Sequence, residues 1–194
     1  MRKLIFVLFV FAMGSVSIKA QMEAGIKGGL NLSDLQVFAS GNSIGNEAFR
    51  TRPSYHIGTF VNSPFSDHFG IQVEVLFSNK GFKYETDSIG TLNASLNYLN
   101  YPALFYYRPS KLIDIEFGPE FGYLVSGEDL VKSFDMGIDV GLRFHFSKKM
   151  HAGIRYYQGF KFDMKEGDFN NGEGSPKYSN STFQVSLGYH LPME

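Results

Sequence analysis

Residues 133–146 read SFDMGIDVGLRFHF and alternate without a break between apolar side chains and side chains that are charged or very small. Successive side chains of a β-strand point to opposite faces, so the pattern predicts a two-faced strand. One face carries Phe134, Met136, Ile138, Val140, Leu142, Phe144 and Phe146. The other carries Asp135, Gly137, Asp139, Gly141, Arg143 and His145. The fold depends on which face points inward: a soluble sheet buries the apolar face, whereas a membrane barrel turns it toward lipid.

Seven further segments show similar patterns, and none shows a helical period. They are residues 22–32, 54–63, 68–84, 93–108, 112–126, 150–164 and 181–191. The connections alternate between short ones (PFSD, PSK and SKK) and longer polar ones, such as residues 33–53. The sequence therefore predicts an all-β fold. We expect a single eight-stranded antiparallel up-and-down transmembrane β-barrel with periplasmic termini, short periplasmic turns and longer extracellular loops.

Glycine indicates which face lies inside. Eleven of the 21 glycines share the charged face of their strands. They are Gly25, Gly29, Gly58, Gly70, Gly118, Gly122, Gly137, Gly141, Gly153, Gly159 and Gly188. Glycine weakens a strand and packs nothing, so a face in contact with water gains nothing from it. The interior of an eight-stranded barrel is only just wide enough for side chains, so long charged residues there need small neighbours.

The apolar face has aliphatic residues in mid-strand and aromatic residues toward both strand ends, which is typical of a lipid-facing surface. Examples are Ile138 and Val140 in the middle, with Phe134 and Phe144 toward the ends. The alternative is a soluble exported barrel that binds a small apolar ligand. That alternative would place glycines in water and crowd the aromatic rings into the narrow interior.

The N-terminus predicts export. Arg2 and Lys3 precede an apolar run of about ten residues, too short to span a bilayer, and a cleavage position follows Ala20. We therefore expect residues 1–20 to be a cleavable signal peptide and residues 21–194 to be the outer-membrane β-barrel domain, located in the outer membrane of a Gram-negative envelope with outer-membrane lipid as its surroundings.

The composition of the chain argues against several classes of function. The formal net charge is −1 and there is no cysteine. The charge gives no reason to expect nucleic acid as a partner, and the lack of cysteine excludes disulfides and thiolate metal sites. No motif indicates a cofactor, so we expect none.

The charged face predicts an ionic network inside the barrel. Its candidate members are Glu74, Asp114, Glu116, Glu120, Asp135, Asp139, Arg143 and Arg155, with Glu23, Lys27 and Lys161 on the same face. With a reversal near residues 129–130, Glu116 would face Arg143 and Glu120 would face Asp139. Unpaired buried charges are costly, so we expect a mutually satisfied plug rather than a porin channel. A selective pore or a proton path is the alternative.

All five histidines fall on the charged face, and His145, His151 and His190 should gather at the periplasmic rim, with His145 opposite His151. Three imidazoles could bind zinc or act as a pH switch. Dense ligand spacing is absent, however, so the sequence predicts no metal site.

Enzymatic activity is not expected. Ser147 and His145 are close in sequence, but no acid that would orient the histidine is evident. A lipid-modifying outer-membrane enzyme remains the alternative.

Several stretches resemble the PorT-like outer-membrane β-barrel family. They are GIKGGLNLS (25–33), YLNYPALFYYRPS (98–110), FGPEFGYLVSG (117–127), DMGIDVGLRFHF (135–146) and IRYYQGF (154–160). The resemblance implies one eight-stranded outer-membrane barrel and no catalytic residue. The family's namesake is tied to secretion of surface proteins by the type IX pathway, so the resemblance also implies secretion or envelope proteins as partners. The oligomeric state stays open.

Overall fold

The structure, a computed structural model, describes residues 22–39, 42–44, 49–86, 90–127, 133–163 and 177–192. The expected signal peptide, residues 1–20, lies outside these ranges. Within them, no helix has the length and apolarity that a membrane crossing requires.

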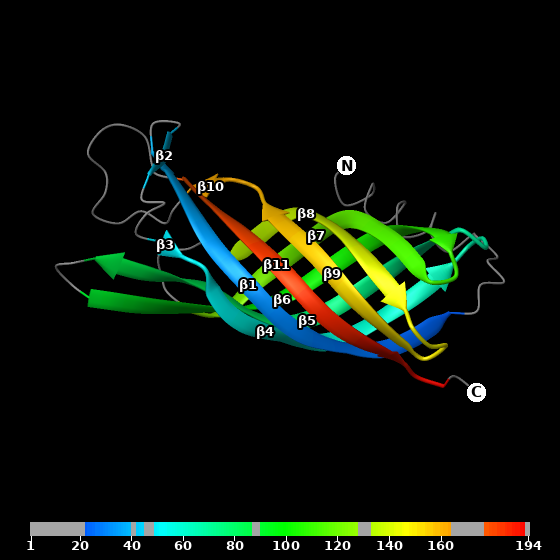
Figure 1. The fold of residues 1–194 in the computed structure, drawn as a ribbon. Helices are drawn as coiled ribbons and strands as arrows, with labels where there is room; N and C mark the ends of the chain where they lie inside the picture. Colours follow the sequence, from blue (N-terminus) through cyan, green and yellow to red (C-terminus); the bar gives the residue numbers. More distant parts are fainter. Residues whose placement is uncertain are drawn as a thin grey trace.

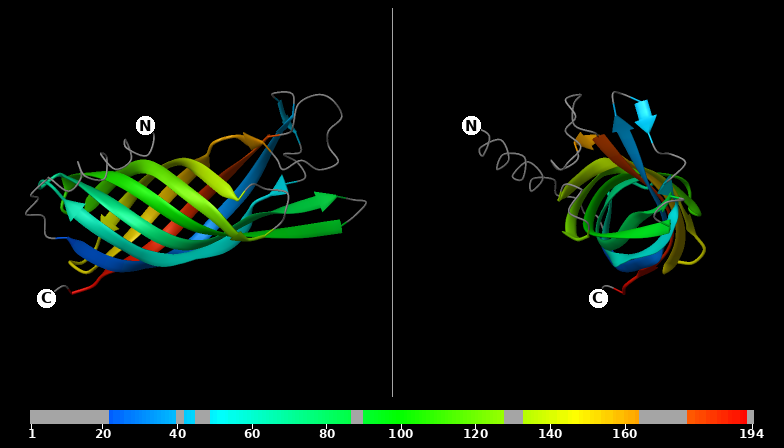
Figure 2. Two further views of the ribbon diagram at one scale, coloured as in Figure 1. Left: turned by 180° about the vertical axis from the view of Figure 1, so that it is seen from behind. Right: turned by 90° about the vertical axis from the view of Figure 1, so that its left-hand side faces the viewer.

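Eight long strands close into an antiparallel barrel (Figures 1 and 2). They are β1 (Glu23–Ala39), β4 (Arg52–Pro64), β5 (Phe69–Thr86), β6 (Gly90–Ser110), β7 (Ile113–Ser126), β8 (Phe134–His145), β9 (Met150–Gly159) and β11 (Lys177–His190). Each strand pairs with the next one in this order, and β11 pairs with β1 from Gly25↔His190 to Phe38↔Lys177. The predicted eight-stranded antiparallel barrel is confirmed.

Several strands are longer than the sequence predicts. Residues 33–39, expected to start a long loop, continue β1, and residues 33–38 pair with β11. Strands β5 and β6 continue to the pair Thr86↔Gly90 and form a hairpin that projects beyond the barrel wall (Figure 1). Three short strands, β2 (Asn42–Ile44), β3 (Phe49–Arg50) and β10 (Phe162–Asp163), lie at the same end of the barrel. These segments are polar in composition, which suggested loops. A strand that continues beyond the membrane needs no apolar outer face, so its sequence lacks the alternation that marks the spanning part.

The two ends of the barrel differ. Short turns at residues 65–68, 111–112 and 146–149 lie at one end, here called the short-turn end. The opposite end, which carries the β5–β6 hairpin, is called the hairpin end. β1 begins and β11 ends at the short-turn end, where the amide of Leu191 donates to the carbonyl of Ala24 at 2.8 Å.

The apolar face points outward. Ile138 and Val140 are 40% and 56% exposed, whereas Asp139 and Arg143 are 0% and 1% exposed. Aromatic residues are exposed toward both ends of the strands, for example Phe144 on β8 near the short-turn end. The soluble barrel with reversed faces is therefore wrong, since it would require these side chains to be enclosed.

Glycines on the inner face make room for large neighbours. A Cβ added to Gly70 would lie 2.1 Å from the hydroxyl oxygen of Tyr106, whose side chain is buried. By contrast, a Cβ on Gly28 would meet no atom closer than 3.5 Å. The interior thus uses glycine as space rather than for backbone freedom.

We expect Gly70→Ala to lower the free energy of unfolding by about 1–3 kcal/mol, because the added methyl overpacks the interior against the Tyr106 ring. Denaturant unfolding of the refolded protein in lipid vesicles measures this change. Gly28→Ala is the matched control and should be tolerated. Equal effects of the two substitutions would contradict the packing argument.

Candidate functional site

The middle of the barrel holds four buried charged side chains from four strands, here called the central cluster: Lys27, Glu74, Glu116 and Arg155. Arg155 Nη2 lies 2.7 Å from Glu74 Oε1 and 2.7 Å from Glu116 Oε1. Lys27 Nζ lies 3.1 Å from Glu74 Oε1. Arg155 also donates from Nη1 to Glu74 Oε2 at 2.9 Å, so its contact with Glu74 is bidentate.

A second group lies toward the short-turn end and is centred on Asp114, which is fully buried. Its carboxylate lies 2.6 Å from Arg108 Nε, 2.7 Å from His145 Nε2 and 3.1 Å from Arg143 Nη2. Arg143 additionally donates to the side chain of Gln72. One carboxylate therefore serves two guanidinium groups and one imidazole.

A third group lies toward the hairpin end. Lys80 Nζ is 2.9 Å from Glu120 Oε1 and 4.0 Å from the centre of the Tyr157 ring. Asn180 donates to Asp135 Oδ2 at 3.0 Å. Asp139 is also buried, and neither of its oxygens has a hydrogen-bond partner among the described residues. All eight side chains proposed for the network are thus inside the barrel, but Asp139 is not part of a satisfied set.

The predicted pairing of β7 with β8 is wrong by two residues. Asp114, not Glu116, lies opposite Arg143, and Gly118, not Glu120, lies opposite Asp139. A shift of two residues keeps every side chain on its face, so hydrophobic alternation cannot detect the error. The pairing expected for the next hairpin, His145↔His151 and Arg143↔Gly153, is confirmed.

Sequence reasoning missed part of the interior and misplaced Lys161. Lys80 shares the face of Glu74 on β5 and could have been found from that spacing, whereas Lys161 is exposed. The interior also holds large rings, which the sequence did not lead us to expect there. They are Phe60, Tyr98, Tyr106, Tyr157 and Tyr178. Glycines opposite some of these rings provide the space, as Gly70 does for Tyr106.

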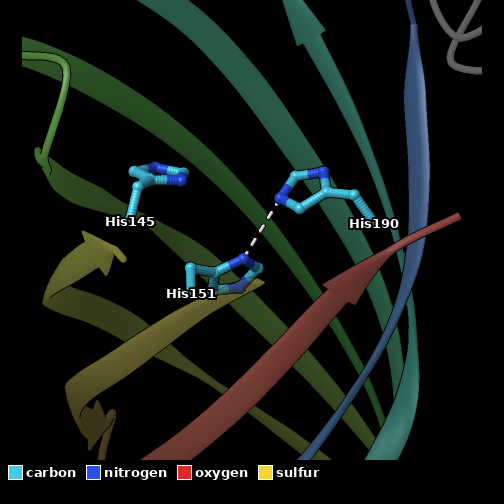
Figure 3. A group of neighbouring side chains, drawn as sticks. All are labelled: His145, His151 and His190. Atoms are coloured by element: carbon cyan, nitrogen blue, oxygen red, sulfur yellow. Dashed lines mark hydrogen bonds between the residues drawn. The ribbon is translucent and has the colours of Figure 1, made fainter. Parts of the chain in front are cut away.

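The histidines separate into three positions. His145, His151 and His190 meet at the short-turn end, where His151 Nδ1 and His190 Nε2 are 3.1 Å apart (Figure 3). His56 is buried deeper and its Nδ1 lies 2.7 Å from Asn31 Oδ1. His68 is exposed in the turn at 65–68, so its expected inward position is wrong.

Ser147 lies in the turn next to His145. Its Oγ accepts hydrogen bonds from the amides of Lys149 and Met150, both at 3.1 Å. Asp114, which the sequence analysis did not associate with His145, orients that ring. No hydrogen bond joins Ser147 to His145 among those of the described residues, so the hydroxyl serves the turn.

An outward apolar face around a buried ionic interior is the pattern of outer-membrane barrels. Residues 17–162 match the family of the outer membrane protein beta-barrel domain. The chain belongs to this family. The family consists of outer membrane proteins, which places this chain in the outer membrane. The family match does not identify the narrower group of PorT-like barrels.

Solved structures share the fold. The outer membrane protein OprG from Pseudomonas aeruginosa is 12% identical, with a TM-score of 0.52, and the match covers 88% of this chain and 96% of OprG. Neisserial surface protein A (NspA) is 8% identical, with a TM-score of 0.54, and the match covers 87% of this chain and 99% of NspA. No curated protein matches the sequence. At these identities the likeness concerns the barrel fold alone.

Proposed function

We propose that this barrel is a non-porin outer-membrane protein whose charge-filled lumen is closed, and that it acts through its rims and projecting segments. One observation carries the proposal. Glu74 on β5 and Arg155 on β9 are four strands apart in a barrel of eight, and their side chains meet at 2.7 Å. This contact crosses the full width of the lumen, and Lys27 and Glu116 flank it.

A planar-bilayer recording tests the closed lumen. We expect the purified protein to give no regular conductance steps, because ions would have to displace buried, mutually bonded side chains. The double variant Glu74→Ser with Arg155→Ser removes both halves of the crossing contact and should raise the conductance. Regular ion-selective steps from the unmodified protein would favour the selective pore instead.

We further propose that the protein is an accessory of secretion or of the envelope, with its short-turn end and termini in the periplasm. The supports are the PorT-like stretches quoted above and the β5–β6 hairpin, which extends past the barrel wall and offers a contact surface. Purification of the tagged protein from a detergent extract should recover secretion-machinery proteins. A variant with this hairpin shortened should recover less of these proteins. Recovery of the barrel alone would count against this role.

A second function has one observation in its favour. His145 contacts Asp114 and comes two residues before Ser147 in the chain, so the three residue types of a hydrolytic triad occur near one turn. We nevertheless propose that the protein is not an enzyme, because among the described residues the Ser147 hydroxyl has no hydrogen bond with His145 and accepts from turn amides instead. Mass spectrometry of envelope lipid should show no difference between cells with the protein and cells with Ser147→Ala. A lipid species lost in the variant would reverse this proposal.

A further inference from the structure

We propose that His145, His151 and His190 form a Zn²⁺ site at the short-turn end of the lumen, with an open coordination position. This inference does not depend on the proposed function. The ligands come from three strands, β8, β9 and β11, so their spacing along the chain gives no metal motif. For this reason the sequence predicted no metal site.

The distances suit one metal ion. One ring nitrogen from each histidine lies within 4.8 Å of the other two. His151 Nδ1 and His190 Nε2 are 3.1 Å apart. Two nitrogens bound tetrahedrally to one zinc at about 2.05 Å are separated by about 3.3 Å. This pair is therefore already at a coordinating distance, and His145 faces it with a ring nitrogen within 4.8 Å of both, which has to move closer to complete the set (Figure 3).

The strands and their packing fix the three rings. His145 and His151 are paired directly across the β8–β9 hairpin, and Gly188, two residues before His190, is paired with His151. A Cβ on Gly188 would lie 2.2 Å from His151 Nε2, so glycine is needed there for the ring to take its place. Phe60 packs edge-on against His151 and His190, with ring centres 5.4 Å and 5.1 Å away.

Two carboxylates contact the rings of His190 and His145. Glu23 Oε2 lies 3.3 Å from His190 Nδ1, on the side of the ring away from His151. Asp114 Oδ2 lies 2.7 Å from His145 Nε2. Metal-binding histidines usually have such an outer partner, which fixes the ring and raises its basicity. Arg108 and Arg143 add positive charge nearby, and both contact Asp114.

A cavity of about 300 Å³ adjoins the cluster, and its walls include Glu23, His145 and His190. It gives an ion access from the short-turn end. Three protein ligands with space beside them match zinc sites that keep a fourth position for water or another ligand. Imidazole suits Zn²⁺, whereas Mg²⁺ prefers oxygen ligands, so the site should discriminate between the two.

Isothermal titration of the untagged, refolded protein in detergent micelles, after removal of metal with a chelator, tests the site. We expect saturable binding of one Zn²⁺ per chain and no competition from Mg²⁺. His151→Gln and His190→Gln should abolish this stoichiometric binding. His68→Gln, in the exposed turn at 65–68, is the matched control and should bind as the unmodified protein does. Glu23→Gln should weaken binding by about ten-fold or more, because it removes the outer partner of His190.

Two measurements keep the test independent of folding. Heat-modifiable gel migration shows whether each variant is a closed barrel. Co²⁺ added in place of Zn²⁺ should give the visible absorption of a tetrahedral site in the unmodified protein, and this absorption should be absent in folded His190→Gln. Lack of saturable Zn²⁺ binding, or unchanged binding by folded His151→Gln, would overturn the proposal.

Discussion

Arg155→Met is expected to lower the free energy of unfolding by about 3–5 kcal/mol, because it leaves the buried carboxylates of Glu74 and Glu116 without their main cation. Both carboxylates lie 2.7 Å from the same guanidinium nitrogen, and the three side chains are at most 3% exposed. Lys27 contacts only Glu74 in the central cluster, so it replaces the guanidinium incompletely. Denaturant unfolding in lipid vesicles measures the loss.

Two variants make this result interpretable. Lys148→Met removes a positive charge from the exposed turn at 146–149 and should change stability by less than about 1 kcal/mol. The double variant Arg155→Met with Glu116→Gln removes one buried cation and one buried carboxylate, leaves Glu74 with Lys27, and should recover part of the loss. A double variant no more stable than Arg155→Met would show that the arginine contributes by packing rather than by charge.

The second large effect is expected on the outer face. Val140 lies near the middle of β8 and is 56% exposed. In a soluble protein, arginine at such an exposed position would cost little. Facing the centre of a bilayer, Val140→Arg should cost about 2–4 kcal/mol. Unfolding in vesicles measures this cost.

Position along the strand provides the control. Val125 is similarly exposed at 53% but lies near the hairpin end of β7, so Val125→Arg should cost only about 0–1 kcal/mol. If Val140→Arg is as mild as Val125→Arg, the outer surface of β8 does not face hydrocarbon at Val140.

The sequence determines the faces of the strands because alternation has a period of two and each error of one residue would invert a whole strand. It therefore placed Asp139 and Arg143 inside and Ile138 and Val140 outside, as the structure does. The same period makes a two-residue slip invisible. That is why the partner of Arg143 on β7 was misassigned.

The remaining differences have similar physical causes. Contacts across the lumen, such as Glu74 with Arg155, join strands that are not neighbours, and no local pattern specifies them. The Tyr106 ring was not expected inside because the room it occupies depends on Gly70, on the neighbouring strand. The histidine cluster was foreseen at the short-turn end, but the carboxylate beside His145 depends on the misassigned register of β7.

The contact between Glu23 and His190 joins the first and the last strand of the barrel, and it can form only after β1 and β11 have paired. The chain has no cysteine of its own. Cysteines placed at Ile26 and Tyr189, which are paired directly across the seam between these two strands, would therefore be the only thiols in the protein, and the rate at which they cross-link would report how quickly the barrel closes during insertion.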